Sequence, residues 1–153
     1  KISIGLLICF ISCKPGVINQ TELKFEEPYL WMSGDTKELI LEVTENSEPC
    51  ELYLDVRYAE PLLPFDKLNL RIIEIQPGGV SIPRDLTIEL RDAAGAILGD
   101  VSGDIVDVER LLDGNKQFLR HGKYSYKIDY NMPVEVLGGI MEFRLRTVKK
   151  KME

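Results

Sequence analysis

Residues 51–58 decide the fold class, and they read Glu51-Leu52-Tyr53-Leu54-Asp55-Val56-Arg57-Tyr58. In a β-strand successive side chains point to opposite faces, so Leu52, Leu54, Val56 and Tyr58 share one face. Asp55 and Arg57 fall on the other. This alternation is typical of a strand with one buried and one solvated face.

The same two-residue period recurs along the chain, at residues 39–44, 68–75, 86–91, 124–130 and 141–146. Glycine and proline turn signals separate these runs, at Pro61 to Pro64, Pro77-Gly78-Gly79, Gly95, Gly103, Gly114-Asn115, Gly122 and Gly138-Gly139. Several half-buried strands with such spacing favour two packed antiparallel sheets. We therefore predict one all-β domain, an antiparallel β-sandwich of jelly-roll or immunoglobulin-like kind, over residues 22–149 with a tail at 150–153.

The alternation also predicts which side chains form the core. The expected set is Leu52, Leu54, Val56, Leu86, Ile88, Leu90, Tyr126, Ile128, Phe143 and Leu145. Residues 104–112 do not follow the two-residue period, because their apolar residues stand at 105, 106, 108, 111 and 112. We predict a short helix or irregular crossover between the sheets there.

An apolar stretch opens the chain, from Ile2 to Ile11 behind Lys1. It is shorter than the roughly 20 apolar residues of a membrane-spanning helix, but it fits the apolar part of a signal peptide. Phe10-Ile11-Ser12-Cys13 resembles a bacterial lipobox, the motif whose cysteine receives lipid after the signal is cut. We predict a lipoprotein signal peptide at 1–12, lipidation of Cys13, and a tether over 13–21.

Charge and cysteine content exclude several classes of protein. The chain has 153 residues and a formal net charge of -6, which disfavours a broad nucleic-acid-binding face. Its one histidine, His121, rules out a multi-histidine metal site. With Cys9 removed and Cys13 lipidated, Cys50 is the remaining thiol, and we expect it to be a small core residue.

Candidate catalytic groups are few. Asp100, Asp104 and Asp107 form an acidic group beside two glycines, but without the EF-hand spacing, so we expect a solvated turn. His121 falls in a turn without a nucleophile motif nearby. Asp55, Glu89, Asp129 and Glu142 occupy outward strand positions, where we expect surface charge pairs rather than carboxyl groups of raised pKa. The sequence therefore predicts a protein that is not an enzyme, with no catalytic, metal or cofactor-binding residues.

Aromatic residues offer one binding alternative. Tyr124, Tyr126 and Tyr130 share a strand face and, together with Trp31, could form a stacking platform for carbohydrate. Because Ile128 lies on the same face, we favour a place in the core for the tyrosines.

Three blocks in order, behind the lipobox, carry a family resemblance. They are Cys50 to Tyr58 with Pro64 to Leu68, then Asp85 to Leu90 with Gly95 to Ile105, then Phe118 to Tyr126 with Leu137 to Ile140 and the last strand. Over about residues 38–149 the chain resembles the gliding motility lipoprotein GldH family. The resemblance implies an envelope lipoprotein that supports gliding motility and type IX secretion, with no catalytic residues.

From this resemblance we expect a non-enzymatic scaffold. Its partners would be the membrane, through lipid on Cys13, and other gliding or type IX secretion envelope lipoproteins. Lys14-Pro15-Gly16-Val17 contains no acidic residue after the lipidated cysteine, which favours a periplasm-facing domain. The alternatives are a carbohydrate- or peptide-binding envelope lipoprotein using Trp31, and, less favoured, a hydrolase at the acidic loop.

Overall fold

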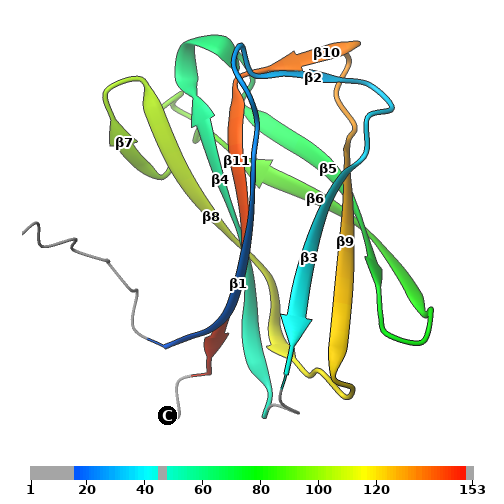
Figure 1. Cartoon of the computed structure of the whole chain (residues 1–153). Coiled ribbons are helices and arrows are strands. Elements are labelled where there is room, and N and C mark those ends of the chain that lie inside the picture. Colours follow the sequence, from blue (N-terminus) through cyan, green and yellow to red (C-terminus); the bar gives the residue numbers. More distant parts are fainter. Residues whose placement is uncertain (1–15, 45–47, 151–153) are drawn as a thin grey trace, which may run out of the picture.

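Two antiparallel sheets pack face to face in the computed structural model, which describes residues 16–44 and 48–150 (Figure 1). The first sheet has five strands in the order β1-β11-β4-β8-β7. Their bounds are β1 Val17–Lys24, β11 Ile140–Lys149, β4 Cys50–Ala59, β8 Ile105–Lys116 and β7 Asp100–Ser102. The predicted all-β sandwich is confirmed.

The second sheet has four strands in the order β3-β9-β5-β6. Their bounds are β3 Lys37–Val43, β9 Gly122–Tyr130, β5 Lys67–Ile75 and β6 Ser81–Glu89. A two-stranded sheet of β2 (Leu30–Met32) and β10 (Val136–Gly138) covers one end of the sandwich, and a short 3-10 helix spans Glu60–Leu62. Among the described residues, no helix is long and apolar enough to cross a membrane.

Strand β4 lies at the centre of the first sheet, between β11 and β8. Its side chains alternate as the sequence indicates, because Leu52, Leu54, Val56 and Tyr58 are all buried against the second sheet. All ten predicted core residues are buried, and Cys50 joins them with 1% of its surface exposed. The predicted period and the predicted core are therefore confirmed.

The helix or crossover predicted at residues 104–112 is wrong, because this segment is the first part of strand β8. Val106 and Val108 point into the core as in any strand. Beyond them, register shifts against β4 near Leu52 and Tyr53 break the alternation. The extra residue of such a bulge interrupts the two-residue period. Two apolar residues, Leu111 and Leu112, can therefore follow each other directly in this strand.

The predicted tether at 13–21 extends too far, because β1 begins at Val17 and pairs with β11 along its whole length. Its residues alternate only between half-buried and exposed, so backbone pairing rather than apolar burial defines this strand. The Lys149 N–H also donates to the Gly16 carbonyl, at 2.9 Å. The predicted signal peptide, Cys13 and residues 151–153 lie outside the described residues.

Two leucines of opposite burial give a direct test of the core. Leu54 is 0% exposed and Leu119 is 73% exposed. We expect Leu54→Ala to lower the free energy of unfolding by about 2–5 kcal/mol, because it leaves a cavity between the sheets. Leu119→Ala is the matched control, with a change of less than about 0.5 kcal/mol. Urea unfolding followed by circular dichroism measures both, and equal losses would contradict the packing described.

Candidate functional site

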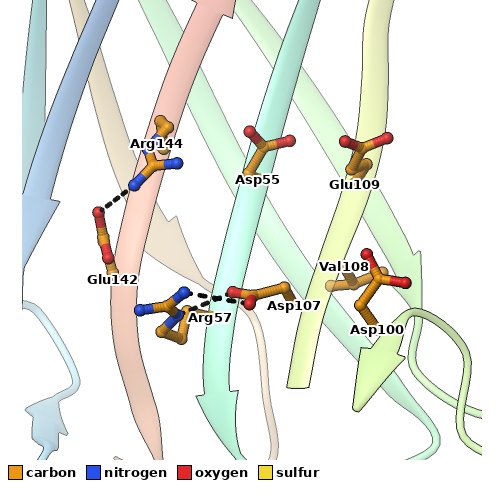
Figure 2. A pocket seen from close by; sticks show the side chains of 8 residues that line it. All are labelled: Asp55, Arg57, Asp100, Asp107, Val108, Glu109, Glu142 and Arg144. Atoms are coloured by element: carbon orange, nitrogen blue, oxygen red, sulfur yellow. Dashed lines mark hydrogen bonds and ion pairs between the residues drawn. The ribbon is translucent and has the colours of Figure 1, made fainter. Parts of the chain in front are cut away.

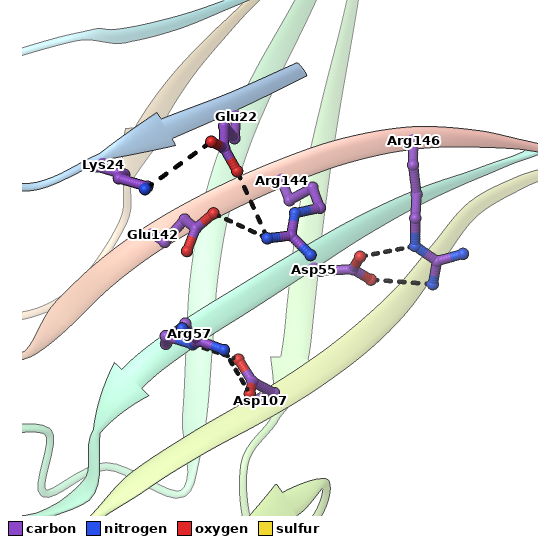
Figure 3. A network of polar contacts seen from close by, with 8 residues as sticks. All are labelled: Glu22, Lys24, Asp55, Arg57, Asp107, Glu142, Arg144 and Arg146. Carbon is purple, nitrogen blue, oxygen red and sulfur yellow. Dashed lines mark hydrogen bonds and ion pairs between the residues drawn. The ribbon is translucent and has the colours of Figure 1, made fainter. Parts of the chain in front are cut away.

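The outer face of the five-stranded sheet carries a network of charged side chains (Figure 3). They come from four neighbouring strands, β1, β11, β4 and β8. The register sets opposite charges side by side, since Arg144 pairs with Asp55 and Arg57 pairs with Asp107. Cross-strand neighbours of opposite charge attract, so the strand pairing itself assembles this face.

Arg146 is the most buried of these cations, with 5% of its surface exposed. Its Nε and Nη2 donate to the two carboxylate oxygens of Asp55, at 2.6 and 3.1 Å, and Nη2 also donates to Glu109 at 2.9 Å. The guanidinium lies 4.4 Å from the centre of the Tyr53 ring. Burial opposes the charge, but the hydrogen bonds to Asp55 together with the negative charges of Asp55 and Glu109 outweigh it and raise the pKa of Arg146. Asp55 and Arg146 thus form a fixed, two-point ion pair.

A second group joins the buried Glu142 to the half-buried Arg144 and the exposed Glu22. Arg144 Nη2 donates to Glu142 at 3.1 Å and to Glu22 at 3.4 Å. Burial, together with a hydrogen bond shared with Glu22, raises the pKa of Glu142, and the same hydrogen bond lowers the pKa of Glu22. The prediction of a simple surface pair at Glu142 is therefore wrong.

A shallow pocket of about 220 Å³ lies on this face (Figure 2). Arg57 spans it and donates to both oxygens of Asp107, at 2.8 and 3.1 Å. Of the predicted acidic group, Asp100 and Asp107 are opposite each other on β7 and β8, whereas Asp104 lies in the turn between those strands. Within residues 16–44 and 48–150, no three His, Cys, Asp or Glu side chains are placed to hold a metal ion.

The proposed stacking platform is absent from the surface, because Trp31 is 1% exposed. Its Nε1 donates to the Asp35 carbonyl at 2.6 Å, and its ring centre lies 4.9 Å from that of Tyr130 and 5.7 Å from that of Phe143. Tyr124 and Tyr126 are buried as predicted. A role for Trp31 in stacking on sugars is therefore corrected to a core role, which follows from its place on the inner face of β2.

The remaining predicted residues have structural places. His121 is exposed in the turn before β9. Cys50 is buried at the start of β4, where its thiol donates to the Lys116 carbonyl at 3.5 Å. Burial raises the pKa of the Cys50 thiol, so the reactive thiolate is disfavoured.

One polar group between the sheets escaped the sequence analysis. Glu74 is buried and lies 2.6 Å from Lys116 Nζ, while the Tyr126 hydroxyl donates to it at 2.6 Å. Burial alone would raise the pKa of Glu74, but these hydrogen bonds outweigh it and lower that pKa. The sequence did hold a signal, since Glu74 continues the inward series Leu68, Leu70 and Ile72. This group joins β5, β9 and β8 at one end of the core.

Comparison with known proteins gives one family. The sequence model of the GldH lipoprotein family matches residues 20–146. These bounds run from within β1 to within β11, so the match includes the charged face and both main sheets. No curated protein matches the chain.

Two arginines on the charged face differ in burial and therefore in expected contribution. In the Arg146–Asp55 pair the side chains are 7% and 16% exposed, against 44% and 47% in the Arg57–Asp107 pair. We expect Arg146→Ala to destabilise the fold by about 3–5 kcal/mol, because it leaves Asp55 buried without its partner. Arg57→Ala should cost less than about 1 kcal/mol. Chemical unfolding of both variants measures this, and equal effects would refute a special role of the buried pair.

Proposed function

The chain belongs to the GldH lipoprotein family, and from this premise we propose that it is a lipid-anchored, non-enzymatic scaffold in the cell envelope. In this proposal it supports the gliding motility and type IX secretion machinery by holding other envelope lipoproteins. The observation that carries the proposal is the family match, because it extends over nearly all of the sandwich.

The way β1 begins supports anchoring close to a membrane. Cys13, the proposed lipidated residue, precedes Gly16 by three positions. The Gly16 carbonyl accepts a hydrogen bond from the Lys149 N–H at the end of β11. An extended chain reaches at most about 3.6 Å per residue, so three positions span roughly 11 Å. The lipid would therefore keep this end of the sandwich next to the bilayer. The end formed by β2 and β10 would point away from it (Figure 1).

The state of the charged face supports binding rather than catalysis. Asp55 and Asp107 each accept two hydrogen bonds from one arginine, so both carboxylates are already engaged. A general base must be available to take a proton from a substrate. A surface of fixed, complementary charges is instead suited to orienting a protein partner.

We propose that the domain faces the periplasm, which rests on the absence of acidic residues in Lys14-Pro15-Gly16-Val17. A periplasmic domain on a short tether would meet other lipoproteins held at the same membrane surface. Both molecules would then be confined to one plane, and confinement raises the effective concentration of each.

Gene deletion and complementation in the source bacterium test this function. We expect deletion to abolish gliding or type IX secretion and to reduce the amounts of partner lipoproteins. The wild-type gene should restore both. Cys13→Ala should restore neither while producing a folded domain, because the anchor is lost. As the matched control, Cys50→Ala keeps the anchor, and we expect it to complement where its domain remains folded. Normal gliding and secretion after deletion would contradict the proposal.

A further inference from the structure

Strand β8 has a long edge that β7 does not cover. β7 pairs only with Ile105–Asp107, whereas β8 continues to Lys116. From Val108 to Leu111, β8 pairs with β4 on one side, and no described strand pairs with it on the other. In an antiparallel pair every second residue directs its N–H and C=O away from the neighbouring strand. Part of the β8 backbone therefore faces outward without a strand to bond to.

A groove of about 680 Å³ lies along this edge, between β8 and β6 of the other sheet. Leu98 and Gly99 close its upper end, where the Leu98 N–H donates to the Leu90 carbonyl. Further along β8, outside the groove lining, Arg84 donates to the Leu112 carbonyl. Since the Leu112 carbonyl is thus engaged, the open edge from residue 108 to residue 111 is roughly 10 Å long, which matches a strand of three or four residues.

Arg110 shows that the sandwich is open at this place. It follows Val108 by two residues and so takes the next inward position of β8, yet it is exposed. Beside it, Ile88 and Val108 form an apolar floor, and both are nearly buried. An added strand could pack beside this floor and extend the five-stranded sheet along the free edge of β8.

The other long edges are less suited to an added strand. Pro83 lies within β6, and proline has no N–H to give to a neighbouring strand. β1 and β3 lie against each other on the opposite side of the sandwich. Of these edges, the edge of β8 has both a groove beside it and backbone groups able to pair with an added strand.

The charge at the groove indicates the chemistry of the occupant. Glu89 and Asp100 stand on opposite sides of it; both are exposed, and neither has a side-chain partner among residues 16–44 and 48–150. Asp107 and Glu109 add two more carboxylates, which accept hydrogen bonds from Arg57 and Arg146, and Arg110 is the one cation among the residues that line the groove. Acidic groups on both sides favour lysine or arginine in the bound segment.

We infer that this groove binds a short, extended, basic segment of another envelope protein. The segment pairs as a strand with the part of the β8 edge that β7 leaves uncovered. Strand addition of this kind gives affinity through backbone hydrogen bonds and selectivity through side chains. The inference rests on the proposed scaffold function, because it identifies the surface by which the scaffold holds a partner.

Photo-crosslinking in cells tests the inference with the full-length, lipidated chain. The probe is p-benzoylphenylalanine at position 110, inside the groove, and at position 38, on the outer face of the other sheet, as the matched site. We expect crosslinks from position 110 alone, mapped by mass spectrometry to one basic segment of a co-purifying protein. In the purified complex, backbone amides within residues 108–111 should exchange hydrogen more slowly than in the free chain.

Charge reversal supplies the control. Glu89→Lys with Asp100→Lys should lower the crosslink yield by about tenfold or more, because it sets like charges against a basic segment. Glu26→Lys with Glu48→Lys makes the same change in net charge at exposed sites outside the groove, and should leave the yield unchanged. Partners that co-purify without crosslinking to position 110 would contradict binding in the groove but would remain consistent with the scaffold function. A crosslink to a second copy of the chain or to lipid, or a yield unaffected by the groove reversal, would also contradict binding in the groove. Absence of any co-purifying partner would overturn both proposals.

Discussion

The pairing of β11 with β1 on one side and β4 on the other is the constraint on which the rest of the structure depends. Through β4, this strand is tied to the centre of the core, where Phe143 and Leu145 are buried. Through β1, it fixes the segment that follows the proposed lipidated cysteine. Its outward residues also supply the carboxyl and guanidinium groups of the charged face. One strand thus connects the proposed anchor with the core and the charged face.

The charged face shows how side chains on the outer face of a sheet can form fixed, specific ion pairs. Arg146 and Glu142 are buried although they point away from the core. Replacing a buried ion pair by apolar residues is often neutral or favourable, so such pairs contribute little net stability on average. We interpret the Arg146–Asp55 pair as setting the register of β11 against β4. A one-residue slip would separate these charges and turn the core residues outward.

The two-residue period was enough to predict the sandwich and the core, because a strand such as β4 has one apolar and one polar face. The period failed where other forces define the strand. β1 is held by backbone pairing and has no apolar face, and a bulge in β8 interrupts its alternation. The burial of Trp31 and the raised pKa of Glu142 depend on strands distant in sequence. Local pattern carries no signal for such contacts, whereas Glu74 could have been found by extending the inward series of β5.

We propose that β1 holds one end of the sandwich next to the membrane, and the distance of each end from the lipid headgroups can be compared directly. Nitroxide labels at position 48, beside the start of β4, and at position 30, on β2, mark the two ends of the domain (Figure 1). The full-length lipidated chain would be placed in nanodiscs whose lipid headgroups chelate nickel, which shortens the relaxation time of nearby labels. We expect clearly stronger relaxation at position 48 than at position 30. Equal relaxation at the two positions, or stronger relaxation at position 30, would contradict this proposal.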